Sequence, residues 1–561
     1  MTFSPATEWS RIFIRELYAW GVRDVVVSPG SRSQALALAA LEWEQFTDGE
    51  LQVHVVIDER SAAFRALGLA LEAARPAVCI ATSGSAPGHY LPAVMEAYHA
   101  GVPLVVVSAD RPEELLGVGA NQTTTHEGLF GIFAHTTSFA APEVIDEEQI
   151  VERVGTVLND VVYDSAPAHI NVAFREPLSG EAGSPLVIPN SREPMRIHSA
   201  PVIVTLDPAI PTLVIAGHGA GSEAEEIAHA LGAPLIAEAV SGAHFGPHLV
   251  LSYRDVLNEG DPLLGLERVV TFGRPTLSRE VWSLLSNQNV EHIAVYGRHA
   301  EPPNPTGNAT LVHGVEVPIP ATAEQRSAHV KPWVMAGRRH HDAALAGIIP
   351  GAPGLDAVAD SDPAARNAFA KAEIEVMRRP VTRESLALAV WEATWPHDRL
   401  VVGASRMARV LDRIAGPKKI KVYSNRGLAG IDGTVSTARG VAQAALRGGD
   451  TGVTRVLLGD LTLLHDASSL MREPGVDEVA KVHIVVANDG GGTIFDTLEV
   501  RQSTSAEAFD RVLYTPHTVD LEALARAYGW DYVAVSTMSG LTEAPARTDT
   551  HLVVDVSLPR D

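Results

Sequence analysis

A regular alternation of short apolar runs with helical segments restricts the fold of this chain more than any other feature of its sequence. In the first third, β-branched or apolar runs cover 22–27, 53–57, 77–81 and 102–107, and polar or glycine-rich residues follow each of them. Strands that alternate with helices form parallel sheets covered by helices on both faces. We therefore expect an α/β fold with doubly wound, mostly parallel sheets.

The same alternation returns later in the chain and indicates several domains. Apolar runs at 400–402, 420–423, 453–458 and 482–487 repeat the pattern, and a further run at 211–216 opens a third α/β unit. At about 150 residues per domain, a chain of 561 residues suggests three domains. Segments rich in Pro, Gly, Ser and charge near 176–194 and 350–367 are typical of linkers. The expected boundaries are an N-terminal domain, a central domain, a linker and a C-terminal domain at 1–185, 195–350, 351–380 and 381–561.

Composition and charge exclude several classes of function. The one cysteine, Cys79, cannot form a disulfide within the chain, which is typical of a reducing cytoplasm. The sequence has no uninterrupted run of about 18 apolar residues, so we expect a soluble cytoplasmic protein without an integral membrane segment. The formal net charge of −24 argues against a nucleic-acid partner, because phosphate backbones need clustered Lys and Arg.

The most specific motif pairs GDLTLLHD with NDGGG. Gly459 and Asp460 follow one predicted strand, Asn488 follows the next, and 27 residues lie between Asp460 and Asn488. One βαβ crossover of this length places both side chains at the carboxyl edge of adjacent strands, where open α/β sheets bind ligands. Carboxylate, amide and carbonyl oxygens suit Mg²⁺, and glycines let the backbone amides approach phosphate groups. The pattern therefore predicts a metal ion that carries a diphosphate.

This pattern resembles the diphosphate-binding signature of thiamine-diphosphate enzymes, in which a GD precedes an Asn by 25–30 residues. The resemblance implies thiamine diphosphate and Mg²⁺, or Mn²⁺, as cofactors. It implies Asp460, Asn488 and the carbonyl oxygen of Gly490 as metal ligands, with Gly459 beside the cofactor. In this loop, GGGT has one residue more than some relatives show before Ile-Phe.

Two more residues of the cofactor site follow from the same resemblance. Glu59, in IDERSAAF, matches the carboxylate that these enzymes place against the aminopyrimidine ring. There it favours the imino tautomer, whose nitrogen removes the thiazolium proton. Ile431, in GLAGIDG, matches the bulky residue that keeps the cofactor bent, although an ordinary core isoleucine fits the pattern equally well. Since the two halves of such sites come from different subunits, the resemblance also implies a homodimer or homotetramer with the active site at the subunit interface.

Basic, hydroxyl and amide side chains gather at the predicted strand ends of both end domains. Guanidinium groups hold carboxylates through paired hydrogen bonds, so four arginines in such places predict small-molecule substrates with several carboxylates. The candidate substrate-binding residues are Ser31, Arg32, Arg111, Asn121, Gln122, Ser405, Arg409 and Arg426.

The combination of SPGSRS, DER, TSGSA, SADRPEEL, GANQ, YSNRG, GDLTLLHD and NDGGG resembles the 2-succinyl-5-enolpyruvyl-6-hydroxy-3-cyclohexene-1-carboxylate synthases of menaquinone biosynthesis. That resemblance covers both end domains and is weak in the central one. It implies a transferase that decarboxylates 2-oxoglutarate and adds the succinyl-semialdehyde carbanion in 1,4 fashion to isochorismate. The products would be 2-succinyl-5-enolpyruvyl-6-hydroxy-3-cyclohexene-1-carboxylate and CO₂.

Other interpretations stay open at this point. The chain could be another thiamine-diphosphate decarboxylase or carboligase, similar to acetohydroxyacid synthases, many of which bind a flavin in the central domain. A non-catalytic regulator with this fold would typically lack Glu59 or Asp460. The loop GHGAGS at 217–222 resembles a dinucleotide loop, but it lacks the last glycine and fits a tight turn better. Arg274 and Arg298 could bind an effector, although a solvated surface is the simpler interpretation.

Overall fold

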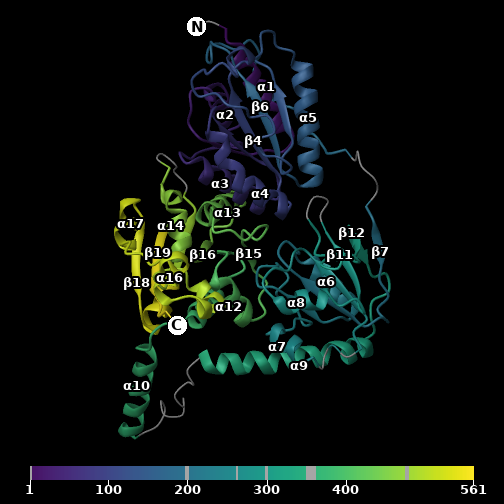
Figure 1. Ribbon diagram of the computed structural model, residues 1–561, viewed down its shortest axis with the longest axis vertical. Helices are drawn as coiled ribbons and strands as arrows, with labels where there is room; N and C mark the ends of the chain where they lie inside the picture. Colours follow the sequence, from purple (N-terminus) through teal and green to yellow (C-terminus); the bar gives the residue numbers. More distant parts are fainter. Residues whose placement is uncertain are drawn as a thin grey trace.

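The computed structural model describes residues 3–195, 201–260, 263, 265–296, 301–348, 362–473 and 479–560. Three α/β units, each built on its own parallel sheet, lie in a triangle, with the N-terminal unit above the other two (Figure 1). In the part of the chain so described, no helix is long and apolar enough to cross a membrane. The expected architecture of doubly wound, mostly parallel sheets is confirmed.

The N-terminal unit contains a six-stranded parallel sheet in the order β2-β1-β3-β4-β6-β5. Its strands are β1 (Asp24–Val27), β2 (Gln52–Val55), β3 (Ala77–Ala81), β4 (Leu104–Asp110), β5 (Thr136–Phe139) and β6 (Ala168–Ala173). Its helices are α1 (Pro5–Ala19), α2 (Gln34–Phe46), α3 (Glu59–Ala73), α4 (Leu91–Ala100) and α5 (Glu147–Asp164). Strands β1, β3 and β4 are buried along their whole length, as expected for strands covered on both faces.

The C-terminal unit repeats this topology, with the order β15-β14-β16-β17-β19-β18. Its strands are β14 (Arg399–Val402), β15 (Lys421–Tyr423), β16 (Val453–Gly459), β17 (Lys481–Asn488), β18 (Asp531–Val535) and β19 (His551–Ser557). Its helices are α11 (Arg383–Ala393), α12 (Arg406–Ile414), α13 (Thr434–Arg447), α14 (Asp460–His465), α15 (Val500–Ser503), α16 (Ala506–Phe509), α17 (Leu521–Ala527) and α18 (Met538–Glu543). Corresponding positions in the two end units therefore lie at the carboxyl edges of similar sheets.

The central unit has a smaller, five-stranded parallel sheet in the order β12-β11-β10-β8-β9 and a two-stranded pair, β13-β7. Its strands are β7 (Ile203–Thr205), β8 (Thr212–Ala216), β9 (Leu235–Ala237), β10 (Arg268–Phe272), β11 (Glu291–Val295), β12 (Thr310–Val312) and β13 (Gly314–Glu316). Its helices are α6 (Glu223–Leu231), α7 (Tyr253–Glu259), α8 (Arg279–Leu285) and α9 (Ala323–Ile348). In the GHGAGS loop, a side chain at Gly217 would meet the backbone of Arg274 and Pro275, so close chain packing accounts for this glycine.

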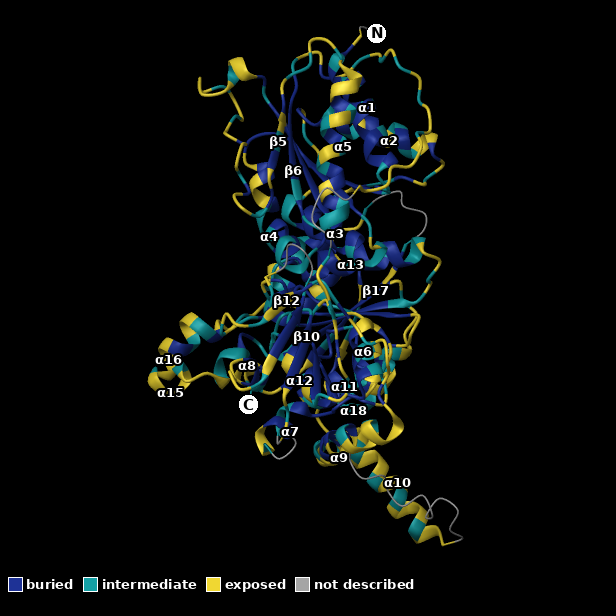
Figure 2. Cartoon of the chain, turned by 90° about the vertical axis from the view of Figure 1, so that its right-hand side faces the viewer, coloured by how far each residue is buried: buried dark blue, intermediate teal, exposed yellow. Residues whose placement is uncertain are grey.

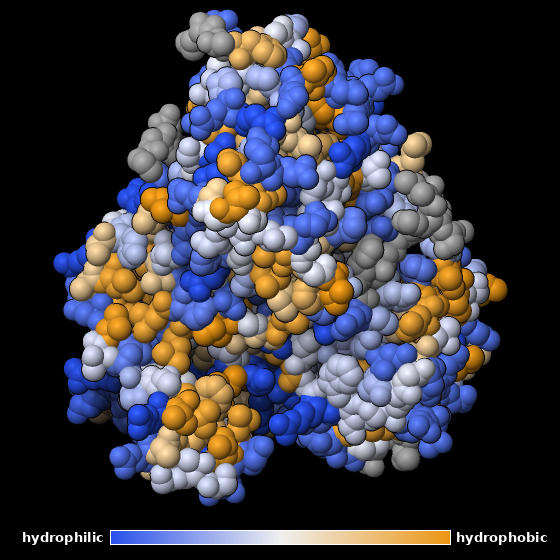
Figure 3. All heavy atoms as spheres, turned by 45° about the horizontal axis from the view of Figure 1, so that its top comes forward, coloured by the Kyte–Doolittle hydropathy of each residue, from blue (hydrophilic) through white to orange (hydrophobic). Residues whose placement is uncertain are grey.

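The segment predicted as a linker, 351–380, contains a helix. Helix α10 (Pro363–Met377) has no buried residue and projects away from the rest of the molecule (Figures 1 and 2), whereas 351–361 lies outside the described residues. Figure 3 shows that one face of the molecule carries several separate apolar patches among polar side chains rather than a continuous apolar band. Isolated patches of this kind are common on folded proteins.

Helices α3 and α13 join the N-terminal and C-terminal units through glycine contacts. A Cβ atom at Gly68 of α3 would lie 2.0 Å from the carbonyl oxygen of Thr437, and one at Gly440 of α13 would lie 2.2 Å from that of Arg65. Each glycine lets the other helix's backbone approach more closely than any side chain would permit. The contact positions the carboxyl edges of the two end sheets relative to each other.

We expect Gly68→Ala to lower the free energy of unfolding by about 1–3 kcal/mol, because the new methyl group must push the two helices apart. Gly155→Ala is the matched control. This glycine also lies within a helix, α5, but its added Cβ would meet only the Trp20 ring at 3.7 Å. That change should instead raise stability by up to about 1 kcal/mol through helix propensity. Thermal unfolding of both variants provides the test, and equal shifts in melting temperature would contradict it.

Candidate active site

The three predicted metal ligands lie together at the carboxyl edge of the C-terminal sheet. Strands β16 and β17 are adjacent and parallel, with Gly459 paired to Ala487, so Asp460 and Asn488 emerge side by side. The backbone N–H of Gly490 donates to Asn488 Oδ1 at 3.3 Å. His517, which the sequence motifs did not identify, approaches Asp460 Oδ2 through Nε2 at 3.1 Å and donates its backbone N–H to the carbonyl oxygen of Gly490 at 3.4 Å. These contacts connect all three predicted ligands.

The charge of Asp460 is only partly compensated within the protein. Burial, and then the negative charge of nearby Asp489, raise the pKa of the Asp460 carboxyl above its ordinary value. Asp489 itself is held by Arg383 at 2.8 Å and by Thr493 Oγ1 at 2.5 Å, so it is turned toward structural partners. A cation beside Asp460 would relieve the cost of burying its carboxylate. The electrostatics of this edge therefore fit a divalent metal ion.

The donor set fits a metal that shares its coordination with a diphosphate. No group of three or more His, Cys, Asp or Glu side chains suited to a metal occurs among the residues that the structure describes. The predicted site instead combines one carboxylate, one amide and one backbone carbonyl, which leaves positions for phosphate oxygens and water, as Mg²⁺ prefers. Gly490 has a φ of +75°, and a Cβ at Gly491 would lie 2.5 Å from the carbonyl oxygen of Tyr514, so this loop requires glycines.

Glu59 is the first residue of α3 and lies at the carboxyl edge of the N-terminal sheet. Its neighbour Asp58 caps the helix by accepting from the backbone N–H of Arg60 at 3.0 Å. Asp58 also accepts a 2.6 Å hydrogen bond from Ser468 Oγ, and Arg60 donates to the carbonyl oxygen of His465 at 2.6 Å. The residues on either side of the half-buried Glu59 thus contact the last residue of α14, the helix that begins with Asp460, and the segment that follows it.

The loop between β15 and α13 carries both Arg426 and Ile431. Ile431 is half-buried in this loop, and the loop ends at Gly433, where φ is +57° and a Cβ would overlap the ring of Phe64. The Arg426 side chain is 4% exposed and donates from Nε and Nη2 to Thr276 Oγ1 at 2.9 and 2.8 Å. Arg426 is therefore fixed by the central unit, a contact that no sequence motif indicated.

The candidate substrate residues of the N-terminal unit meet around Ser83. Arg111 donates from Nη1 to Ser83 Oγ at 2.6 Å, and Gln122 Nε2 donates to the carbonyl oxygen of Ser83 at 3.0 Å. Arg32 is close to this group, since burial and then the charge of Arg111 lower the pKa of its guanidinium. Ser31 and Asn121 have exposed side chains at the same edge. The structure thus brings these five predicted residues to one edge of the sheet.

A buried polar network supports the Arg111 loop and was not found from the sequence. Asp110 contacts His126 Nδ1 at 3.3 Å and accepts from Asn171 Nδ2 at 3.0 Å. Ser108 Oγ donates to Asn171 Oδ1 at 2.7 Å and contacts His169 Nε2 at 2.7 Å. Hydrogen bonds are electrostatically stronger in the low-dielectric interior, so a buried network of this kind restricts the orientations of its members. It ties strands β4 and β6 to the loop that carries Asn121 and Gln122.

Ser405 and Arg409 belong to α12 in the C-terminal unit. Ser405 caps this helix by accepting from the backbone N–H of Met407 at 3.2 Å. Arg409 is close enough to Arg426 for its charge to act on it. Burial, and then the charge of Arg409, lower the pKa of the Arg426 guanidinium. Within the described parts of the chain, no hydrogen bond or ion pair joins these residues to the group around Ser83. The candidate substrate residues therefore form two groups in one protomer.

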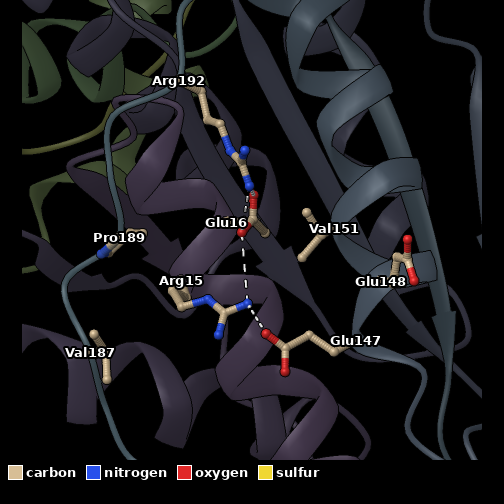
Figure 4. A pocket seen from close by; sticks show the side chains of 8 residues that line it. All are labelled: Arg15, Glu16, Glu147, Glu148, Val151, Val187, Pro189 and Arg192. Carbon is tan, nitrogen blue, oxygen red and sulfur yellow. Dashed lines mark hydrogen bonds and ion pairs between the residues drawn. The ribbon is translucent and has the colours of Figure 1, made fainter.

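A surface hollow between α1, α5 and residues 187–192 contains none of the predicted site residues (Figure 4). Arg15 pairs with Glu147 at 2.7 Å, and Arg192 pairs with Glu16 at 3.2 Å, so its charges are largely compensated. The ion pairs engage both arginines, Glu16 and Glu147, so few charged groups of this hollow are left for a ligand. Arg298, one of the two arginines considered for an effector, lies outside the described residues, while Arg274 donates to the carbonyl oxygen of Gly427 at 3.0 Å.

Comparison with known proteins defines the class first. Residues 7–129 match the family described as "Thiamine pyrophosphate enzyme, N-terminal TPP binding domain". The crystal structure of benzoylformate decarboxylase from Polynucleobacter necessarius has the same fold, with a TM-score of 0.64, 15% sequence identity and 99% of each chain covered. The first match indicates the class of thiamine-diphosphate enzymes for the N-terminal domain, and the second shows the fold of the whole chain.

Longer and closer relatives define the family. A 2-succinyl-5-enolpyruvyl-6-hydroxy-3-cyclohexene-1-carboxylate synthase from Leifsonia xyli is 45% identical over 97% of this chain and 94% of its own length. Synthases of the same name from Clavibacter michiganensis and an Arthrobacter species are 43% and 39% identical, over 100% and 96% of this chain and 97% and 87% of their own lengths. The chain belongs to the 2-succinyl-5-enolpyruvyl-6-hydroxy-3-cyclohexene-1-carboxylate synthase family, as predicted, and not to the acetohydroxyacid-synthase-like alternative.

Proposed function

We propose that this transferase decarboxylates 2-oxoglutarate and adds the resulting four-carbon unit to isochorismate. The products are 2-succinyl-5-enolpyruvyl-6-hydroxy-3-cyclohexene-1-carboxylate and CO₂. The observation that carries this proposal is similarity to synthases of that name along nearly the whole chain. Four arginines at the carboxyl edges of the two end sheets support it, because both substrates carry more than one carboxylate.

Thiamine diphosphate, when bound, supplies a nucleophilic carbon and an electron sink for the decarboxylation. In our proposal, Asp460, Asn488 and the carbonyl oxygen of Gly490 hold Mg²⁺, or Mn²⁺, together with oxygens of the diphosphate. His517 orients the Asp460 carboxylate from its other side. A residue that orients a metal ligand usually matters for affinity nearly as much as the ligand itself.

Glu59 moves a proton at the aminopyrimidine ring in this mechanism. A carboxyl group at that ring nitrogen favours the tautomer that acts as the internal base. Ile431 would pack against the cofactor when it is bound and would support its bent conformation. Arg32, Arg111, Arg409 and Arg426 bind and orient the substrate carboxylates, and Ser31, Asn121, Gln122 and Ser405 donate hydrogen bonds to the substrates. Holding both substrates in position contributes much of the rate enhancement.

The site is completed, we infer, by a second copy of the chain in a homodimer or homotetramer. The N-terminal domain (1–185) binds the pyrimidine half of the cofactor and the C-terminal domain (381–561) binds the diphosphate half, each with its partner's complementary domain. The central domain (195–350) and the linker (351–380) separate them in sequence. Val55 and Ile57, which precede Glu59, are 50% and 64% exposed, as expected for apolar residues that a partner covers. We place the enzyme in the cytoplasm, where its one cysteine stays reduced.

The reaction itself tests the proposal. We expect CO₂ release from 2-oxoglutarate, in the presence of thiamine diphosphate and Mg²⁺, to increase at least about tenfold when isochorismate is added, with equal consumption of isochorismate. The increase is expected because, in the proposed reaction, turnover is complete only when isochorismate accepts the four-carbon unit. Release of CO₂ that isochorismate does not change, or isochorismate that is not consumed, would contradict the assignment. Omission of Mg²⁺ with a chelator serves as the control.

A further inference from the structure

Glu238 is a buried acid between the central and C-terminal units, outside every motif found in the sequence. It follows β9 and is 1% exposed. Its Oε1 atom accepts from the backbone N–H groups of Thr276 and Leu277 at 2.6 and 2.7 Å. Its Oε2 atom is buried without a hydrogen-bond partner in the part of the chain that the structure describes. One carboxyl group thus fixes the loop that carries Thr276.

Thr276 in turn fixes the guanidinium of Arg426. Its hydroxyl oxygen accepts from Nε and Nη2 at 2.9 and 2.8 Å, and its carbonyl oxygen accepts from Nη2 at 3.2 Å. The Nη1 atom of Arg426 makes no hydrogen bond within the described residues. Two nitrogens of the Arg426 guanidinium therefore donate to the central unit, and the third, Nη1, remains available for a substrate carboxylate.

The residue next to Glu238 holds the other arginine-bearing element. The backbone N–H of Ala239 donates to Asp412 Oδ1 at 2.9 Å, and Asp412 Oδ2 accepts from Tyr253 Oη and Arg254 Nη2, both at 2.6 Å. Asp412 lies in α12, three residues after Arg409, so the two side chains share one side of the helix. Residues 238–239, at the carboxyl end of β9, thus connect both the Arg426 loop and α12 to the central sheet.

The charges around Glu238 favour its neutral form. Burial raises the pKa of Glu238 well above the usual range, and the carboxylate of Asp412 raises it further, while Arg426 acts in the opposite direction. Tyr253, from α7, also faces this group, and Arg254 donates to Asp412 Oδ2 at 2.6 Å. A neutral acid accepts hydrogen bonds from the loop without competing with a substrate carboxylate for Arg426, whereas an ionised one would attract the guanidinium.

We propose that Glu238 is a positioning residue for substrate binding: through Thr276 it holds Arg426 in the orientation that receives a substrate carboxylate. This inference rests on the proposed function, because it assigns Arg426 to a substrate. It extends that function by making the central unit part of the specificity machinery.

Substitutions at Thr276 test the connection without removing a charge. Thr276→Val lacks the hydroxyl that accepts from Arg426, and Thr276→Ser retains it. We expect the valine variant to raise the KM of one of the two substrates about 10- to 100-fold, with kcat changed less than about threefold, because hydrogen bonds to charged groups have effects of this size. The serine variant should stay within about threefold of the wild type. An unchanged KM in the valine variant, or equal losses in both, would overturn the proposal.

Glu238→Gln tests the role of the proton. In the wild type, ionisation of Glu238 at alkaline pH should lower kcat/KM, because the carboxylate then attracts the Arg426 guanidinium. In Glu238→Gln the amide oxygen still accepts from Thr276 and Leu277 but the side chain cannot ionise, so part of this expected decline should be lost. Stability supplies a readout independent of turnover. In the wild type, a folded-state pKa raised above 4.5 means that stability falls as pH rises from that value to the folded-state pKa. The melting temperature of the glutamine variant, relative to the wild type, should therefore increase from about pH 5 to about pH 8.

The outcomes separate this inference from the proposed function. If the wild-type enzyme does not consume isochorismate together with 2-oxoglutarate, the proposed function is wrong. The positioning role of Glu238, which depends on that function, is then also overturned. An active wild type whose alkaline decline and pH-dependent stability are the same in Glu238→Gln overturns the inference alone. Loss of the alkaline decline together with the KM effect of Thr276→Val would support both.

Discussion

Replacing Glu59 with glutamine is expected to lower turnover by about 10²- to 10⁴-fold while thiamine diphosphate still binds. Glu59 is half-buried at the first position of α3, and its neighbours Asp58 and Arg60 make the contacts that hold this helix against the C-terminal unit. The substitution therefore removes the carboxyl group that we propose exchanges the proton, and it leaves those contacts in place. The loss should appear in kcat and kcat/KM alike, because the interaction acts in the reaction and not in substrate binding.

A matched control separates this effect from a general effect of charge. Glu148 is an exposed glutamate in the first turn of another helix of the same unit, α5, and Glu148→Gln should leave turnover within about twofold of the wild type. Calorimetric titration with thiamine diphosphate and Mg²⁺ measures cofactor binding, and CO₂ release measures turnover. Turnover within about tenfold of the wild type in Glu59→Gln would show that Glu59 is not the proton-exchanging group.

Asp460→Ala is expected to weaken Mg²⁺-dependent binding of thiamine diphosphate by at least about 100-fold. Loss of a residue that only orients a metal ligand typically costs about 10- to 100-fold in affinity, so loss of the one predicted carboxylate ligand should cost more. The folded protein should tolerate the change, because burial raises the pKa of Asp460 and its carboxylate is thus not favoured by the folded state at neutral pH.

The measurement is a titration of thiamine diphosphate at several Mg²⁺ concentrations, followed by tryptophan fluorescence or calorimetry. Asp531→Ala is the control, since Asp531 begins β18 in the same unit and its side chain is exposed. That variant should bind the cofactor as the wild type does. A cofactor affinity in Asp460→Ala equal to that of the wild type would remove Asp460 from the metal site, whereas a lowered melting temperature without cofactor would indicate a structural role instead.

Several strands were predicted from local composition and others were not. The run at 77–81 coincides with β3, and the run at 22–27 contains the shorter β1. Strands β5 and β6 were not predicted, although they complete the N-terminal sheet beside β4. Strand β5, with the sequence TTSF, lies at the sheet edge and has little apolar character. Its place depends on pairing with β6, which is information that a short window of sequence does not contain.

The sequence by itself determined the architecture and the place of the candidate metal site. Alternating strands and helices predict parallel sheets, and one crossover between Asp460 and Asn488 places both at the same edge, so these two conclusions need only local periodicity and spacing. The cofactor class followed from the resemblance of the motifs to thiamine-diphosphate enzymes. The tertiary structure alone decided which distant residues meet the site: His517 beside Asp460, Thr276 on Arg426, and Glu238 behind Thr276. These contacts join residues separated by about 40 to 150 positions. They arise from packing between elements and units, which no local pattern records.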